Sequence, residues 1–77
     1  MDGDYRIILK GLYHTFTQDF ERVLTFDLLI SFQKDKGDGL NCYDYTFRQL
    51  SKIDACNLLR YITMTFDCND FIEIQIQ

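Results

Sequence analysis

The chain has 77 residues and a mass of 9.2 kDa, which is enough for one hydrophobic core and excludes a second. Hydrophobic residues make up 47% of the sequence and aromatic residues 16%, so the composition excludes an intrinsically disordered chain. Twelve acidic and 8 basic side chains give a formal net charge of -4, which disfavours direct binding of nucleic acid. We therefore expect one small acidic domain over residues 1–77.

Nothing in the sequence predicts a membrane protein or a secreted one. There is no run of about 18 apolar residues, and residues 1–4 lack the basic start of a signal peptide. The three cysteines, Cys42, Cys56 and Cys68, cannot all pair within one chain, so we expect reduced thiols. These features predict a cytoplasmic protein.

The first apolar segment, residues 5–10, alternates apolar and charged side chains and predicts a strand. Gly11 then loosens the chain, and residues 12–20 have no clean periodicity, so a continued strand, a bulge and a loop all remain open. For residues 16–24, strand, loop and helix remain open.

The longest pattern of alternation covers residues 24–33 and predicts a half-buried strand. A competing helix would begin at about Asp19 and place Phe20 and Leu24 on one face. We favour the strand, because Asp27 would intrude on the apolar helix face. The alternating apolar residues are Leu24, Phe26, Leu28, Ile30 and Phe32.

Residues 34–39 combine charges with Asp38-Gly39, which predicts a hairpin turn. A third strand, residues 40–47, should follow the turn. Side chains alternate between its two faces. One face carries Tyr43, Tyr45 and Phe47, and the other carries Cys42, Asp44, Thr46 and Arg48.

Ser51 predicts the start of a helix over residues 52–66, because its hydroxyl can accept from the backbone N–H of Asp54. An apolar stripe at helical spacing should pack this helix on a sheet. The last segment, residues 71–77, alternates again and predicts a strand whose isoleucines lie in the core. These are Ile72, Ile74 and Ile76.

The predicted element order is β-β-β-α-β, an α+β fold in which one helix covers one face of a mostly antiparallel sheet of about four strands. One helix leaves apolar surface uncovered, and Tyr43, Tyr45 and Leu29 are candidates for it. In the alternative, which we favour, the tyrosines pack under the helix and Asp44 faces solvent.

The sequence predicts no metal site, no cofactor and no catalytic site. The three cysteines are 14 and 12 positions apart and His14 is the single histidine, so no zinc-binding spacing is present. A cysteine activated by His14 is the one enzymatic alternative, and no local pattern supports it. Gly37-Asp38-Gly39 lacks the lysine and hydroxyl of a phosphate-binding loop. We expect a protein that is not an enzyme.

The candidate binding residues are carboxylates and tyrosines near the predicted hairpin. Carboxylates accept paired hydrogen bonds from arginine as phosphates do, and tyrosine offers rigid contact area. The simpler interpretation is that the 12 acidic side chains provide solubility. We propose a partner-binding patch for a basic protein surface, made of Asp35, Asp38, Asp44, Tyr43 and Tyr45.

A hairpin with a glycine-rich acidic turn (residues 26–47), followed by a Ser51-capped amphipathic helix (residues 51–66), resembles the small acidic inhibitors of phages and mobile elements, notably anti-CRISPR proteins. The resemblance covers residues 24–66 and is one of size, charge and element order. It implies a protein that inhibits a Cas nuclease or another nucleic-acid enzyme in the host cytoplasm, in some members by mimicking nucleic acid. It carries over no site residue.

Two functions are therefore expected. The first is a protein-binding inhibitor from a phage or mobile element, which blocks a host defence or nucleic-acid enzyme and binds neither nucleic acid nor membrane. The alternative is a homodimeric structural or regulatory subunit that assembles through an open sheet face or through its C-terminal edge strand.

Overall fold

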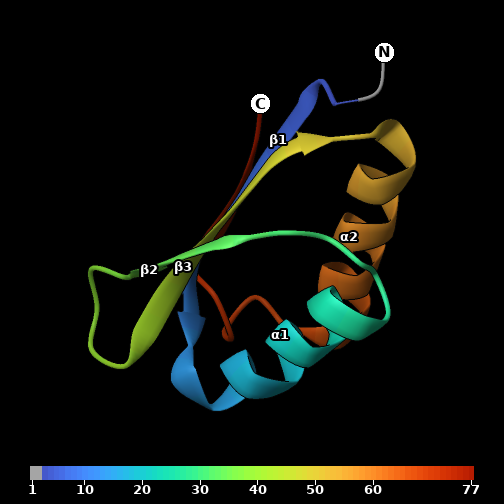
Figure 1. Ribbon diagram of the computed structural model, residues 1–77. Helices are drawn as coiled ribbons and strands as arrows, with labels where there is room; N and C mark the ends of the chain where they lie inside the picture. Colours follow the sequence, from blue (N-terminus) through green and yellow to red (C-terminus); the bar gives the residue numbers. More distant parts are fainter. Residues whose placement is uncertain (1–2) are drawn as a thin grey trace.

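A computed structural model describes residues 3–77 and shows four strands and two α-helices (Figure 1). The described elements are β1 (Tyr5–Tyr13), the short 3₁₀ helix η1 (His14–Phe16), α1 (Thr17–Phe26), β2 (Gln33–Lys36), β3 (Cys42–Leu50), α2 (Lys52–Thr65) and β4 (Glu73–Ile76).

The strands form one sheet in the order β2-β3-β1-β4, and every neighbouring pair is antiparallel. Because β1 and β2 are both antiparallel to β3, they are parallel to each other, with α1 between them in the chain and β3 between them in space. This is the split β-α-β arrangement of the β-α-β-β-α-β motif. Both helices lie on one side of the sheet (Figure 1). The α+β class and the four-stranded sheet are confirmed, but the sheet has two covering helices instead of one.

The additional helix is α1, so the predicted strand over residues 24–33 is wrong. Phe20 and Leu24 are fully buried, four positions apart on one face of α1, as in the competing helix interpretation. Leu29 then has a φ of 56° and reverses the chain, and Ile30 is buried again. The alternation of residues 24–32 therefore combines the end of a helix with an extended segment.

Phe20 joins the two helices to the sheet. Its ring centroid lies 5.0 Å from that of Tyr45 on β3, 6.0 Å from that of Tyr61 on α2 and 5.7 Å from that of Phe66. Such aromatic pairs add to the free energy gained by burying apolar area. The additional helix, α1, is thus a structural part of the single core.

β1 continues beyond Gly11 through a bulge, one of the possibilities that the sequence left open. The register with β3 shifts between Leu9 and Leu12, and both of these leucines are fully buried. Gly11 has a φ of 71°, which favours glycine. A Cβ at Gly11 would lie 2.4 Å from side-chain carbons of Ile72, so the close approach also requires glycine.

The face of the sheet that the helices leave uncovered, called the open face here, is polar. Tyr45 and Phe47 are fully buried on the helix side, as in the favoured interpretation of β3. The expected leftover apolar face is therefore wrong, because α1 covers the apolar side and the open face carries mostly charged and amide side chains. By strand register these include Arg6, Lys10, Gln33, Asp35, Asp44, Arg48, Glu73 and Gln75.

The C-terminal half begins as the sequence predicts. The Ser51 side chain accepts a hydrogen bond of 3.0 Å from the backbone N–H of Asp54 at the start of α2. The predicted burial of the isoleucines is not observed: in β4 Ile74 is half-buried and Ile76 is 59% exposed, and Ile72, just before β4, is 67% exposed. This part of the prediction is wrong, because β4 is an edge strand with a neighbour on one side only.

Candidate protein-binding surface

Asp35 on β2 and Asp44 on β3 lie directly opposite each other in the sheet. Residues in such a pair project from the same face, and here it is the open face. Asp35 is exposed and Asp44 is half-buried. The Asp44 carboxylate accepts a hydrogen bond of 2.9 Å from the backbone N–H of Gly11. The bulge in β1 therefore fixes the position of Asp44.

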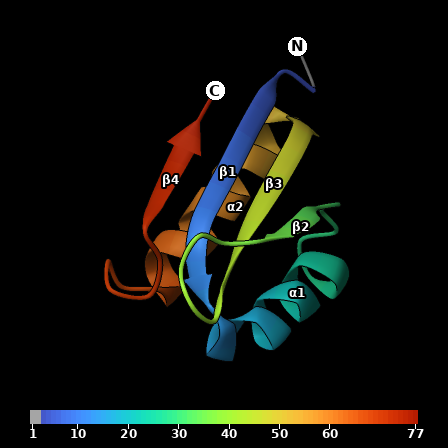
Figure 2. The same ribbon diagram turned by 90° about the vertical axis from the view of Figure 1, so that its left-hand side faces the viewer.

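Asp38 is exposed and lies in the connection between β2 and β3. The connection, residues 37–41, projects from the open face (Figure 1 and Figure 2). A Cβ built on Gly37 would lie 3.2 Å from the Asp44 carboxylate, so Gly37, the residue before Asp38, lies near Asp44. The Asp35–Asp44 pair, together with Asp38 in the connection between the two strands, is called the acidic cluster here.

Among residues 3–77, no ion pair neutralises the acidic cluster, although Lys10 and Arg48 lie on the same open face. Asp35 accepts a side-chain hydrogen bond of 3.2 Å from Gln33, and neither Asp35 nor Asp44 forms an ion pair with a described residue. Like charges directly opposite each other in a sheet are destabilising. The fold therefore holds two adjacent carboxylates at an energetic cost.

The two predicted tyrosines do not belong to this surface. Tyr45 has no exposed area and lies in the core, and Tyr43 is half-buried on the same helix-facing side. A strand sends alternate side chains to opposite faces, so Asp44 cannot share a surface with Tyr43 and Tyr45. The structure pairs Asp35 with Asp44, places Asp38 in the connection between their strands, and puts the two tyrosines on the other face of the sheet.

A second polar group, which the sequence did not reveal, lies on the helix side. Glu21 on α1 accepts a hydrogen bond of 2.6 Å from the Tyr45 hydroxyl and pairs with Lys34 Nζ at 2.7 Å. Lys34 Nζ also lies 4.4 Å from the centroid of the Tyr43 ring. Because these residues are far apart in the chain, only the packing of α1 on the sheet could show this group.

The packing shifts two pKa values in opposite directions. Burial raises the pKa of Glu21, but hydrogen bonds from Lys34 and Tyr45 lower it more, so the net value is below the usual 4.5. Burial and the Glu21 carboxylate raise the pKa of the Tyr45 hydroxyl above its usual 10.0. Glu21 is therefore ionised and Tyr45 neutral near pH 7, which suits a structural contact.

Residues proposed for other chemistry lie apart from the acidic cluster. His14 is exposed and its ring centroid lies 4.7 Å from that of Tyr13. Cys42 is buried, whereas Cys56 and Cys68 are exposed. Among residues 3–77, no group of three or more His, Cys, Asp or Glu side chains is arranged to hold a metal ion.

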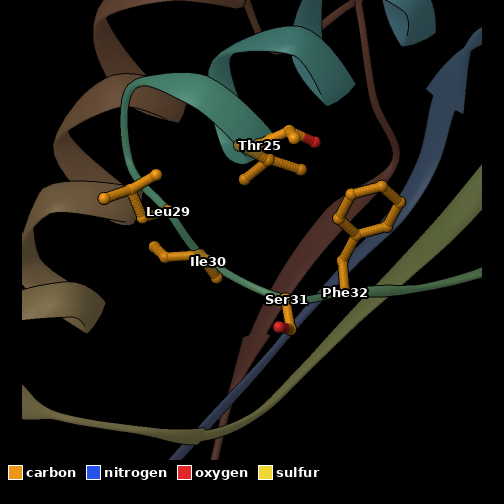
Figure 3. A pocket seen from close by; sticks show the side chains of 6 residues that line it. Thr25, Leu29, Ile30, Ser31 and Phe32 are labelled. Carbon is orange, nitrogen blue, oxygen red and sulfur yellow. The ribbon is translucent and has the colours of Figure 1, made fainter.

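An open groove lies between the end of α1 and the segment that leads to β2 (Figure 3). Its volume is about 430 Å³, and it contains no side chain that ionises near pH 7. The groove therefore offers apolar contact and two hydroxyl groups, but no acid–base chemistry. Its lining residues are Leu24, Thr25, Leu29, Ile30, Ser31 and Phe32.

Comparison of the chain with protein-family models, with curated proteins and with solved structures gave no match. In the part of the chain that the structure describes, no helix is both long and apolar enough to span a membrane.

Proposed function

We propose that the protein is a non-enzymatic inhibitor that binds the basic surface of a nucleic-acid enzyme through the acidic cluster of Asp35, Asp38 and Asp44. The observation that supports this most strongly is the direct pairing of Asp35 with Asp44 across β2 and β3. Natural proteins retain locally unfavourable arrangements mainly where function needs them. A basic partner would relieve the repulsion between these carboxylates.

The chemistry of the cluster suits arginine and lysine side chains that otherwise bind phosphates. Carboxylates take bidentate hydrogen bonds from the planar guanidinium group, as phosphates do. Residues directly opposite each other in an antiparallel sheet have Cα atoms about 4.5–5.5 Å apart. One guanidinium group or two neighbouring cations can therefore bridge the carboxylates of Asp35 and Asp44. Mimicry of adjacent phosphates is thus the proposed mode of inhibition.

The projecting hairpin connection supplies a contact beside the charges. Leu40 is 91% exposed at this connection, two positions after Asp38. Interfaces combine a few apolar anchors with a polar rim. Leu40 is the proposed apolar anchor, with the acidic cluster next to it.

Affinity capture from a bacterial lysate tests the proposal. Tagged wild-type protein is compared with a variant that carries Asp35→Asn, Asp38→Asn and Asp44→Asn, and bound proteins are identified by mass spectrometry at low and high salt. We expect the wild-type protein to retain a nucleic-acid enzyme at low salt and to release it at high salt, because salt screens exposed charges. The triple variant should not retain that enzyme.

The matched control carries Asp19→Asn, Asp27→Asn and Asp67→Asn, which change the net charge equally but lie outside the acidic cluster. These three side chains are exposed. The control should retain the same enzyme as the wild-type protein. Equal loss in both variants would show that overall charge, and not the cluster, controls binding.

The resemblance to anti-CRISPR proteins makes a Cas nuclease the first purified enzyme to test. An inhibitor of this kind would be encoded by a phage or mobile element and would act in the host cytoplasm, as expected from the sequence. An inhibition assay with a Cas nuclease also separates binding from inhibition, since a captured enzyme that stays fully active would contradict this function.

A further inference from the structure

The two edges of the sheet differ in a way that bears on assembly. β2 carries Lys34, Asp35 and Lys36 at one edge, and lysines on an edge strand discourage pairing with another chain. β4 forms the opposite edge (Figure 2) and has the sequence Glu-Ile-Gln-Ile, without lysine or proline. Only the β2 edge is protected by its side chains.

The hydrogen bonds between β1 and β4 identify the backbone groups at the free edge. Arg6 and Gln77 exchange both backbone hydrogen bonds, at 3.1 and 2.8 Å. In an antiparallel ladder, hydrogen-bonded pairs alternate with non-hydrogen-bonded pairs. Ile76 and Ile74 therefore direct their N–H and C=O groups away from β1. Among residues 3–77, no strand pairs with that side of β4.

We propose that β4 binds β4 of a second copy of this chain, antiparallel, with the two-fold axis at Gln75. This register pairs Ile74 of each copy with Ile76 of the other. Each such pair exchanges both backbone hydrogen bonds, so the outward groups of Ile74 and Ile76 are all satisfied. The product is one continuous sheet through both copies, an isologous dimer.

The side chains favour the same register. Ile74 and Ile76 project from the helix side, as their partners Leu9 and Ile7 do. Pairing would therefore cover Ile76, which is 59% exposed in the single chain. On the open face, Glu73 of one copy lies opposite Gln77 of the other, so no like charges face each other. The choice of a second copy as the partner strand rests on this self-complementarity.

Sedimentation of the full chain tests whether the dimer forms. The apparent mass should rise from 9.2 kDa towards twice that value as the concentration increases from low to high micromolar. Ile76→Pro removes an N–H that points outward, which an edge strand tolerates, and should keep the protein monomeric. Ile76→Val keeps both the N–H and the apolar character and should still dimerise. Circular dichroism establishes that both variants are folded.

Cysteine cross-linking tests the register independently. In a background with Cys56→Ser and Cys68→Ser, Gln75→Cys places the two new thiols across the axis, where the Cα separation of about 4.5 Å suits a disulfide. Glu73→Cys is the matched control, because two copies of residue 73 lie about 13 Å apart in this register. Gln75→Cys should form a disulfide-linked dimer on oxidation, and Glu73→Cys should not.

The proposal would be overturned if the full chain stayed monomeric at high micromolar concentration and the Gln75→Cys and Glu73→Cys variants cross-linked equally. Another outcome is that a monomeric chain captures a different protein and loses this capture in the Ile76→Pro variant. In that case a strand of the other protein would pair with β4, and the assignment of a second copy would be wrong. The acidic cluster lies on the β2–β3 side of the sheet, so its asparagine variants should leave the dimer unchanged.

Discussion

The Tyr45 hydroxyl donates a hydrogen bond of 2.6 Å to Glu21 Oε2, and the same oxygen pairs with Lys34 Nζ at 2.7 Å. This contact holds Lys34 on the helix side of the sheet, although Lys34 precedes Asp35 in the chain. Lys34 and Lys36 both flank Asp35 in β2, and strand alternation directs both lysine side chains to the face opposite Asp35. Among residues 3–77, Asp35 therefore forms no ion pair with either of the lysines that flank it in the chain.

Tyr45→Phe should destabilise the fold without removing its aromatic contacts. The variant leaves Glu21 with Lys34 as its remaining partner, and loss of a hydrogen bond to a charged group costs about 1.5–3 kcal/mol. Urea unfolding at pH 7 measures the change. Tyr43→Phe is the control, because the Tyr43 hydroxyl has no hydrogen bond to a described side chain, and it should stay within about 0.5 kcal/mol of the wild type.

Acid should weaken the fold partly through Glu21. The pKa of Glu21 is below 4.5 in the folded protein, so its ionised form stabilises the fold above that pH. This stabilisation is lost as the pH falls through the folded-state pKa. Urea unfolding at about pH 7 and about pH 3 should show a smaller acid-induced loss for Glu21→Gln than for the wild type. Glu73→Gln, at an exposed glutamate on β4, should behave as the wild type does, and an equal loss in all three proteins would contradict this role of Glu21.

Gly11→Ala should be strongly destabilising. The φ of 71° disfavours a side chain, and the added Cβ would clash with Ile72 at 2.4 Å, so we expect a loss of more than about 1 kcal/mol. Thermal unfolding measures the loss, which corresponds to at least about 4 °C in a domain of this size. Gly39→Ala, where φ is not in the left-handed region and the nearest atom is Cys42 Sγ at 3.2 Å, should cost much less.

Asp35→Asn should separate stability from binding. Removing one of two opposed charges relieves a repulsion, so the free energy of unfolding should rise by about 0.2–1 kcal/mol. The same substitution should weaken capture of the partner. A gain in one property and a loss in the other is the trade-off expected of functional residues. If Asp35→Asn lowered stability and left capture unchanged, the carboxylate would have a structural role only.

The sequence predicted those elements whose signals are local. The Ser51 cap and the stripe of Ala55, Leu58 and Ile62 are contained within one helix, and both appear in α2. The hairpin connection contains its own glycines and charges, although residues 34–36, predicted as part of the turn, belong to β2. In these segments local side-chain preferences agree with the final packing.

The prediction from the sequence was wrong where one alternating pattern ran across parts of two elements. Leu24 ends a helical stripe and Ile30 belongs to an extended segment, yet together they give the spacing of a single strand. The exposure of Ile76 also could not be predicted, because it depends on β4 being an edge strand with one neighbour. Strand order is a long-range property that alternation does not encode.

The candidate site was predicted only in part for the same reason. Asp35 and Asp44 are nine positions apart; the sequence placed both near one hairpin, but it put Asp35 inside the turn, whereas Asp35 lies in β2 opposite Asp44. The contact of Glu21 with Tyr45 depends on how α1 packs on the sheet, and no short-range signal in the sequence indicates it.

Competition with nucleic acid tests the central claim most directly. A labelled DNA oligonucleotide is bound to the captured enzyme, and its fluorescence anisotropy is followed as the protein is added. If the acidic cluster occupies the nucleic-acid surface, the wild-type protein displaces the oligonucleotide, and the variant with asparagine at positions 35, 38 and 44 needs at least about tenfold more protein, which is about 1.4 kcal/mol of binding free energy. A ternary complex that keeps the oligonucleotide bound, or equal displacement by both proteins, would contradict the account.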